Sequence, residues 1–301
     1  MSRPAWRNLS GIVLLDKPQG LSSNAALQRV RRIFQAEKAG HTGSLDPLAT
    51  GLLPVCFGEA TKIAGLLLGS RKAYDTEARL GATTTTDDVE GEIVLQREVP
   101  ALDAAAIDAA LAALRGRIVQ VPPVYSALKQ AGVPLYKRAR RGEDVTVPPR
   151  EVDVHRFELL EQTGDRLRLH VECGSGTYVR SLVRDLGERL GCGAHVTALR
   201  RLWVEPFTAP RMHTLDALAG LAEADPAALD ALLLPLEQGV AGYRQVRLDD
   251  GQAVRLRQGQ AVELGLPPGR CVALDEAGRA VALAEIGPDG YLRSLRGFHR
   301  L

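Results

Sequence analysis

Residues 40–54 read Gly-His-Thr-Gly-Ser-Leu-Asp-Pro-Leu-Ala-Thr-Gly-Leu-Leu-Pro, and the acidic side chain in this stretch is Asp46. No helical apolar period precedes Asp46, and Gly40 and Gly43 permit backbone angles that other residues avoid. Pro47 disfavours helical geometry at the residue before it. The stretch therefore predicts a shaped loop that presents the Asp46 carboxylate. From Asp-Pro alone, the plainer interpretation is an ordinary turn residue, because Asp is common in turns.

The apolar pattern on both sides of this loop predicts alternating short strands and helices. A helix capped by Ser22 or Ser23 would bury Leu27, Val30 and Phe34. The other expected helices cover Glu59–Leu68, Leu102–Arg115 and the stretch from Leu182 to Leu190. The expected strands are Gly11–Leu15, Leu52–Phe57, Lys72–Leu80, Val152–Leu160, Arg166–Cys173 and Ala194–Arg201.

Residues 120–150 are rich in proline and show no sustained apolar period. Basic side chains outnumber acidic ones here by four, and two tyrosines are interleaved among them: Lys129, Lys137, Arg138, Arg140, Arg141 and Arg150 against Glu143 and Asp144, with Tyr125 and Tyr136. A loop this long inside a compact domain is typically functional or disordered. A basic loop with aromatic residues suits a flexible clamp on folded RNA. A merely solvated run of charges is the alternative.

From about Leu236 the sequence changes to short alternating segments separated by glycine-rich turns at 249–251, 276–278 and 288–290. This texture predicts a small β domain at the C-terminal end. At 301 residues the chain exceeds one typical domain, so a large domain followed by a small one fits its length. A hydrophobic content of 45% indicates a globular protein with a sizeable core.

Charge and cysteine content exclude some classes of protein. The net charge of +2 does not by itself indicate a nucleic-acid binder. The four cysteines share no CxxC spacing and cluster with none of the six histidines, so we expect buried thiols and no metal site. No apolar stretch is long enough for a signal-peptide core or a membrane span, and we expect a cytoplasmic protein that makes no contact with a membrane.

The whole of residues 40–54 resembles the signature Gly-His-(Thr)-Gly-x-Leu-Asp-Pro-x-Ala-Thr-Gly-x-Leu-Pro of the TruB family of RNA pseudouridine synthases. In that family this aspartate is the catalytic nucleophile, which assigns the role to Asp46. The resemblance implies an α+β fold. A mixed, largely antiparallel sheet with flanking helices would form a catalytic domain over residues 1–235, with a basic RNA-gripping insertion at about 120–150. A small β-barrel of the PUA type, at 236–301, would bind RNA.

Two further motifs of the family carry residues for the base pocket. The segment Lys72-x-Tyr74 ending in Leu80-Gly81 matches one of them, and its tyrosine would lie against the target base and relay a proton. The segment Gly176-x-Tyr178-Val179-Arg180 matches another, in which the arginine pairs with the nucleophile and the tyrosine lines the pocket. Without these motifs, Tyr74 is as well explained as a core tyrosine and Arg180 as a surface arginine.

The remaining motifs supply supporting residues. In the Asp-Lys-Pro-x-Gly segment, the family places Lys17 and Pro18 under the active-site floor. Asp88 matches the last acid of a Thr-Asp-Thr-x-Asp run and would join an arginine–aspartate network, although Thr85 stands where an aspartate is often found. Leu199 would touch the flipped base, and His41 would occupy the space that the base leaves. A helix cap at Asp88 and a structural histidine at 41 are the alternatives.

The resemblance implies that the chain isomerises uridine to pseudouridine at position 55 in the T-loop of tRNA. The bond from N1 of uracil to the ribose breaks, the base turns, and it is rejoined through C5, so we expect no cofactor and no metal. Flipping the base out of the loop costs a few kcal/mol, and stacking on Tyr74 returns roughly 1–3 kcal/mol. The expected partner is the tRNA T-arm, with no obligatory protein partner and a monomeric enzyme.

Three other functions are compatible with parts of this pattern. An RNA-guided synthase of the dyskerin type shares the Asp46 motif, although such relatives lack the basic insertion. A tRNA-binding or tRNA-folding factor would use the pocket for recognition more than for turnover. A glycoside hydrolase fits least, because the second carboxylate that it requires has no partner motif here.

Overall fold

The computed structural model of the chain describes residues 6–126, 129–130, 133–135, 138, 141, 143 and 145–299. Its main feature is an eight-stranded sheet in the order β1-β3-β12-β4-β11-β10-β7, with β2 paired to β3 beside this path. All neighbours in it are antiparallel except β12 and β3, which are parallel. The expected mixed, largely antiparallel sheet is therefore confirmed. Its strands are β1 (Gly11–Lys17), β2 (Ala39–His41), β3 (Thr50–Phe57), β4 (Lys72–Leu80), β7 (Gly116–Gln120), β10 (Arg150–Thr163), β11 (Arg166–Cys173) and β12 (Ala194–Val204).

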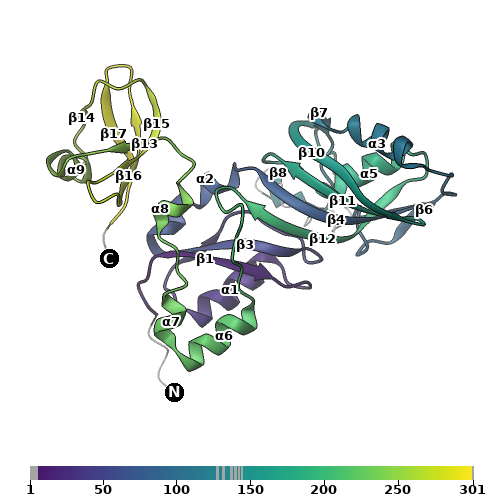
Figure 1. Cartoon of the computed structure of the whole chain (residues 1–301), viewed down its shortest axis with the longest axis horizontal. Helices are drawn as coiled ribbons and strands as arrows, with labels where there is room; N and C mark the ends of the chain where they lie inside the picture. Colours follow the sequence, from purple (N-terminus) through teal and green to yellow (C-terminus); the bar gives the residue numbers. More distant parts are fainter. Residues whose placement is uncertain are drawn as a thin grey trace.

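Helices flank this sheet and close its apolar core, with α3 and α5 near one end and α1, α6 and α7 near the other (Figure 1). Ser22 caps α1, since its hydroxyl accepts a hydrogen bond from the backbone of Ala25 at 3.1 Å. The helices are α1 (Ser23–Ile33), α2 (Ala64–Leu68), α3 (Ala104–Ala112), α5 (Val179–Arg189), α6 (Leu215–Ala224), α7 (Pro226–Asp230) and α8 (Leu236–Gly239).

Strand β4 illustrates how the alternating pattern fixes the sheet. Its even-numbered residues from Lys72 to Leu80 are buried, whereas Asp75, Glu77 and Arg79 are half-buried or exposed. The two predicted faces of this strand are confirmed. Strand β4 lies between β11 and β12 in the sheet. Tyr74, Ala78 and Leu80 on its buried face belong to the main core.

Strands β3 and β12 approach each other more closely than side chains would allow. Gly51 has a φ of +95°, and a Cβ atom built on it would lie 2.1 Å from the carbonyl oxygen of Arg201. Only glycine fits this contact. The Asp46 loop leads directly into β3, so Gly51 locks that loop against β12.

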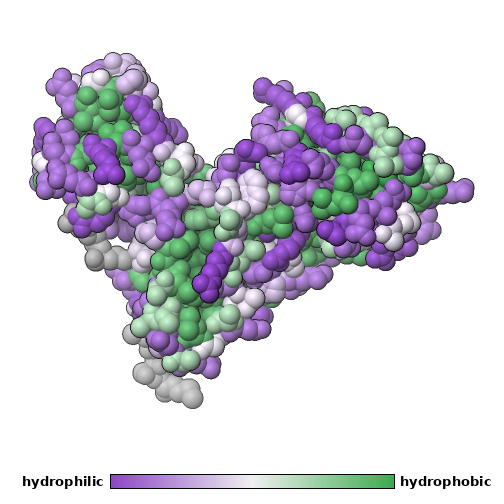
Figure 2. Space-filling model, viewed as in Figure 1, coloured by the Kyte–Doolittle hydropathy of each residue, from purple (hydrophilic) through white to green (hydrophobic). Residues whose placement is uncertain are grey.

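The C-terminal region forms a second sheet of five strands in the order β13-β15-β16-β17-β14. It projects from one end of the molecule (Figure 1), and the surface between it and the large sheet is hollowed (Figure 2). Val272, Leu274 and Phe298 join it to the rest of the chain by packing into a cluster with Ile12 and Leu52. The strands are β13 (Gln245–Arg247), β14 (Val262–Glu263), β15 (Gly269–Leu274), β16 (Ala280–Ile286) and β17 (Tyr291–Gly297).

Two local expectations were wrong. The predicted turn at 249–251 is the start of helix α9 (Asp250–Arg257), in which Asp249 and Gln252 form a reciprocal capping box. The predicted helix Glu59–Leu68 is instead a 3-10 segment, η1 (Gly58–Ile63), followed by the short α2. Gly58, with a φ of +50°, lies against the backbone of Leu9, and this contact shapes the entry to the 3-10 turn. Closure of the C-terminal sheet into a barrel stays a prediction.

The basic stretch 120–150 is only partly described. Short strands β5 (Ala82–Thr84) and β6 (Ile93–Gln96) precede it, and β8 (Lys129–Gln130) pairs with β9 (Val133–Pro134) inside it. Arg138 forms an ion pair with Glu143. Of the charged and tyrosine residues named for the predicted clamp, four lie outside the described residues: Tyr136, Lys137, Arg140 and Asp144.

Candidate active site

The Asp46 loop is held in place from the N-terminal side of the sheet. The Ser23 hydroxyl accepts from the backbone N–H of Leu45 at 2.7 Å and lies 3.1 Å from the carbonyl of the same residue, to which it donates. On the other side of Asp46, the carbonyl of Pro47 accepts from the backbone of Gly20 at 2.8 Å. Both neighbours of Asp46 are therefore fixed, and its carboxylate is presented on a rigid turn.

Lys17 lies beneath this loop and is fully buried. Its Nζ donates to the carbonyls of Leu21 at 2.6 Å and Pro18 at 2.9 Å, and lies 3.5 Å from that of Pro47. Burial lowers the pKa of this amine to about 8, while the nearby Asp46 carboxylate opposes the shift. Lys17 thus ties the turn after β1 to the Asp46 loop, whereas the Pro18 ring is exposed.

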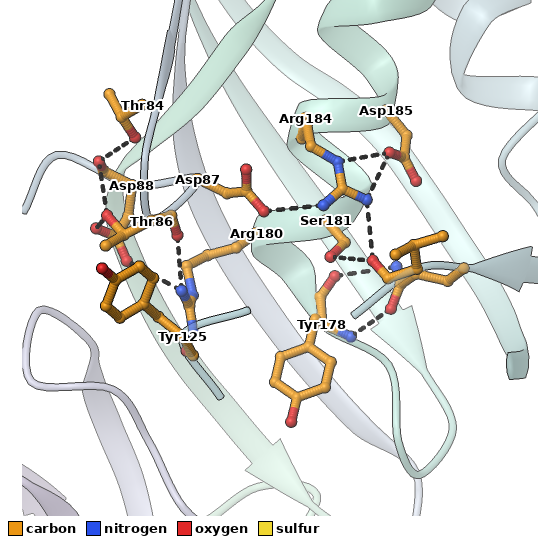
Figure 3. A network of polar contacts seen from close by, with 12 residues as sticks. Thr84, Thr86, Asp87, Asp88, Tyr125, Tyr178, Arg180, Ser181, Arg184 and Asp185 are labelled. Atoms are coloured by element: carbon orange, nitrogen blue, oxygen red, sulfur yellow. Dashed lines mark hydrogen bonds and ion pairs between the residues drawn. The ribbon is translucent and has the colours of Figure 1, made fainter. Parts of the chain in front are cut away.

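Arg180 faces Asp46 from the first turn of α5. Its Nε lies 2.9 Å from Oδ2 of Asp46, and the two side chains are 3% and 37% exposed. The N–H bond of this Nε does not point at the carboxylate, so the contact is an ion pair without an aligned hydrogen bond. The two terminal nitrogens donate elsewhere, to the carbonyls of Thr86 at 2.7 Å and Tyr125 at 3.0 Å (Figure 3).

Asp88 is the second carboxylate at this guanidinium. It is 3% exposed, and its Oδ2 lies 3.5 Å from Arg180. Its Oδ1 accepts from the hydroxyl of Thr86 at 2.6 Å and from the backbone of Glu90 at 3.0 Å. Thr85, at the position where relatives often carry an aspartate, stays out of this network and accepts from the backbone of Glu92 at 3.2 Å.

Burial raises the pKa of the Asp46 carboxyl above its usual value, and the negative charge of Asp88 adds to the shift. Arg180 and Lys17 oppose it by favouring the ionised form. The Asp46 side chain is 37% exposed, so its carboxylate is accessible. It receives no aligned hydrogen bond from the Arg180 Nε, and is therefore less stabilised than a carboxylate with two aligned hydrogen bonds. These are the properties that a carboxylate nucleophile needs.

Asp46 and Arg180 lie in the wall of a cavity of about 300 Å³. This volume is at the lower end of the range for small-molecule sites and suits a single nucleoside. The cavity brings together the candidate residues Asp46, Tyr74, Tyr178, Arg180 and Leu199. Its remaining lining residues are Gly43, Ser44, Leu45, Leu68, Lys72, Arg150, Gly174, Ser175, Gly176, Thr177, Val179 and Arg201.

Tyr74 lies on the buried face of β4 and is 8% exposed. Burial raises the pKa of its hydroxyl to about 12, although the charge of Arg201 opposes the shift. At neutral pH this tyrosine is protonated. It can therefore pass on a proton, but it does not rest as a tyrosinate.

Tyr178 is the residue that precedes α5, and Gln120 at the end of β7 fixes its backbone. The Gln120 side chain accepts from the N–H of Tyr178 at 2.8 Å and donates to its carbonyl at 3.1 Å. The guanidinium of Arg150 lies 4.9 Å from the centre of the tyrosine ring. Arg150, expected to belong to the basic clamp, thus lines the cavity itself.

His41 lies at the end of β2, five positions before Asp46, and is not among the lining residues of the cavity. Burial lowers the pKa of its ring, and the charge of Arg201 acts in the same direction. The ring is therefore neutral at physiological pH. Among the described residues its Nδ1 has no hydrogen-bond partner.

Two cations of the cavity wall were not recognised from the sequence as part of the site. Arg201 is 1% exposed and donates to the carbonyls of Leu52 at 2.7 Å and Gly43 at 3.2 Å. Lys72 is 8% exposed and donates to those of Leu68 and Ser70. The position of Lys72 two residues before Tyr74, on one face of a strand, was a usable signal. Arg201 offered none, because arginine is rarely buried.

Arg200, which precedes Arg201 in β12, has a structural position. Both of its terminal nitrogens donate to the Asp16 carboxylate, at 3.0 and 2.9 Å. The described residues contain no group of three or more histidine, cysteine, aspartate or glutamate side chains that could hold a metal ion. Within the same residues, no helix has the length and apolar character needed to cross a membrane.

Comparison with known proteins identifies the family. A model of the TruB family pseudouridylate synthase N-terminal domain matches residues 31–179, and a model of the tRNA pseudouridylate synthase B C-terminal domain matches residues 180–241. The chain is 57% identical over 300 residues to tRNA pseudouridine synthase B of Xanthomonas axonopodis pv. citri, covering 99% of this chain and 97% of the relative. The chain belongs to the TruB family. Proteins of the same name from Xylella fastidiosa and Stutzerimonas stutzeri are 57% and 50% identical, with at least 96% of both chains covered.

Solved structures with the same fold come from multi-component complexes. One is an H/ACA RNP bound to a substrate RNA containing 2′-deoxyuridine, with a TM-score of 0.75 and 23% identity over 96% of this TruB-family chain and 85% of the other. Another is a Cbf5–Nop10–Gar1 complex, with a TM-score of 0.72 and 25% identity over 93% and 79%. These likenesses support the predicted pseudouridine synthase fold.

Proposed function

We propose that Asp46 is the nucleophile of this enzyme and that its target is the uridine at position 55 in the T-loop of tRNA. The chain is a pseudouridylate synthase, and its relatives at 50–57% identity are named tRNA pseudouridine synthase B. It isomerises uridine to pseudouridine in tRNA. The observation that carries the assignment of Asp46 is its 2.9 Å ion pair with buried Arg180 in the wall of the cavity.

In this proposal the flipped uridine enters the cavity with its base between Tyr74 and Leu199. The ionised Asp46 attacks the ribose C1′ or the base C6 and forms a bond to that carbon, and the bond between N1 and C1′ breaks. After the base turns, a bond forms between C5 and C1′ and the bond to Asp46 breaks, which regenerates the carboxylate. C5 loses its proton and N1 gains one, so that the product is an isomer of the substrate. Arg180 keeps the carboxylate charged and directed into the cavity.

Tyr74 is the proposed relay for the C5 proton. Because its pKa is raised to about 12, it accepts this proton only while its own proton moves onward. Tyr178 lines the base pocket, and His41 fills the space left in the RNA. Lys17, Pro18 and Asp88 support the nucleophile and its arginine.

The finer features of the proposal are a T-arm substrate, a monomeric enzyme and a cytoplasmic location. We further propose that residues 1–235 form the catalytic domain and that residues 236–301 form an RNA-binding domain of the PUA type. An RNA-guided enzyme of the dyskerin type is not favoured, because the solved relatives of that kind share only 23–25% of residues with this chain.

Release of tritium from tRNA labelled with [5-³H]uridine tests the nucleophile. We expect Asp46→Asn to lose at least about 10³-fold in rate while still binding tRNA, since the amide retains the shape of the side chain but cannot attack. Asp108→Asn, at an exposed ion pair on α3, is the matched control and should retain full activity. Release at the wild-type rate by Asp46→Asn would rule out the assignment. Turnover of a bare T-arm RNA without other proteins would separate this function from a guided one.

A further inference from the structure

Helix α5 carries a second arginine, Arg184, one turn after Arg180 and close to the same face. Figure 3 shows both guanidinium groups, each in contact with a loop that contains Thr86 and Asp87 and with a segment that starts at residue 121. Arg184 is not among the residues that line the cavity, and the mechanism above does not use it. Its contacts nevertheless converge on the segments that hold Arg180.

The first shared segment is the turn at residues 84–88. Nη1 of Arg184 donates to Oδ2 of Asp87 at 3.0 Å. Asp87 has a φ of +60°, which is uncommon for a residue with a side chain, and its backbone carbonyl accepts from Val196 at 3.1 Å. The adjacent Thr86 supplies the carbonyl that Arg180 binds. Arg184 therefore fixes the turn that presents one of the two acceptors of Arg180.

The second shared segment is the start of the basic stretch. Nη2 of Arg184 and the hydroxyl of Ser181 both donate to the carbonyl of Val121, each at 2.9 Å. Four residues later, the carbonyl of Tyr125 accepts from Arg180 at 3.0 Å. Arg184 and Ser181 thus anchor the segment that presents the other acceptor of Arg180.

We propose that Arg184 is a positioning residue for pseudouridine formation, which holds these two segments so that their carbonyls orient the Arg180 guanidinium towards Asp46. This inference rests on the proposed role of Asp46. Because Thr86 and Tyr125 occupy both terminal nitrogens of Arg180, its Nε is the nitrogen left within ion-pair distance of Asp46. Loss of Arg184 frees the two carbonyls to move, and the guanidinium then turns away from the carboxylate. The same contacts connect the predicted RNA clamp to the nucleophile.

Single-turnover pseudouridine formation on a T-arm RNA, with enzyme in excess and over a range of pH, tests this inference. We expect Arg184→Met to lower the maximal rate about tenfold, while the enzyme concentration for half-saturation changes less than about twofold. The charged groups that act on Asp46 include Arg180, Asp88 and Lys17, and Glu90 also interacts with it electrostatically. With Arg180 displaced, the acid limb of the rate profile should move to higher pH, because the carboxylate loses its counter-charge.

Arg189→Met is the matched control, since Arg189 is an exposed residue in the last turn of the same helix. It should leave both the rate and the acid limb unchanged. Arg184→Lys retains the positive charge near Asp87, but its single amine cannot bind the Val121 carbonyl at the same time. We expect its maximal rate to be about threefold lower than that of the wild type. Circular dichroism checks the fold, and if Arg184→Met does not fold, Arg184→Lys decides by the same readouts.

Equal rates for the Arg184 and Arg189 variants would overturn the inference, as would a slower Arg184 variant whose acid limb has not moved. A wild-type protein that forms no pseudouridine would instead overturn the proposed function. An active wild type with an inactive Asp46→Asn variant retains that function whatever the Arg184 variants do.

Discussion

Buried charges around the cavity and in the C-terminal sheet are stabilised in opposite ways. The cavity region contains four cations that are at least nine-tenths buried, and most of their hydrogen bonds go to backbone carbonyls: Lys17, Lys72, Arg180 and Arg201. In the C-terminal sheet the buried charged residue among those described is Asp275, which pairs with Arg257 and Arg279.

The two regions differ in how far the charge of the buried side chains is compensated by the groups that bind them. Neutral carbonyls leave the charge of a bound cation uncompensated, whereas the charge of the Asp275 carboxylate is offset by its two arginine partners. The cavity is therefore left with an excess of positive potential, directed at Asp46 and available to an anionic RNA. The C-terminal sheet gains stability from its paired charges and little field.

The largest effect that this comparison predicts is on stability. Replacing Arg201 by methionine would leave the carbonyls of Leu52 and Gly43 buried without a donor. We expect a loss of about 2–4 kcal/mol in the free energy of unfolding, measured by urea denaturation. A loss below about 1 kcal/mol would contradict the view that these carbonyls depend on the buried cation.

The second prediction concerns the dependence of stability on pH. Burial lowers the pKa of Lys17 from 10.5 to about 8. Between pH 8 and 9 the unfolded chain therefore binds more protons at this residue than the folded one, and stability rises with pH. Lys17→Met should remove part of this rise, as measured by urea denaturation at pH 7.5, 8 and 9. The window ends at pH 9 because the buried thiols of Cys56 and Cys173, whose pKa values are raised from 9.0, then act in the opposite direction.

A third prediction separates the two carboxylates at Arg180. The negative charge of Asp88 raises the pKa of Asp46. Asp88→Asn should therefore move the acid limb of the pseudouridine rate profile to lower pH, because Asp46 with a lower pKa stays ionised in more acidic solution. A limb that moves to higher pH would mean that Asp88 acts mainly by holding Arg180 in place.

The smallest effect is expected at the surface of the C-terminal sheet. Arg293 pairs with Asp289 at an exposed site, where solvent screens the attraction. Arg293→Met should leave the melting temperature unchanged within error, in contrast to Arg201→Met. A clear drop in melting temperature would show that the exposed Arg293 contributes to stability as the buried Arg201 does, and would contradict the comparison.

Local sequence patterns predicted strands such as β4 and β11 well, because apolar and polar residues alternate along each of them. The alternation in Lys72–Leu80 and the hairpin of β10 and β11 are confirmed, with β10 longer than expected. Helix α9 was missed because an Asp-Asp-Gly turn signal overlaps its capping box. The 3-10 segment η1 depends on the contact of Gly58 with Leu9, and such a contact has no local sequence signal.

The site was predicted to the extent that motifs carried it. Asp46, Tyr74, Tyr178, Arg180 and Leu199 meet in one cavity as the resemblance implies. The burial of Arg201 could not be predicted, because it arises where β12 pairs with β3 at Gly51. The role of Arg150 was also unforeseen, since only the fold places the start of β10 beside Tyr178.

The pairing of β3 with β12 has a consequence for synthesis on the ribosome. Arg201 and its acceptor Leu52 are 149 residues apart in the chain. Such a distant contact closes a long loop and forms slowly compared with local hairpins. The Asp46 loop emerges early, but it remains without Arg180 and Arg201 until most of the polypeptide has been translated. A nascent chain released before β12 would thus lack the arginine that binds the carbonyls of Leu52 and Gly43.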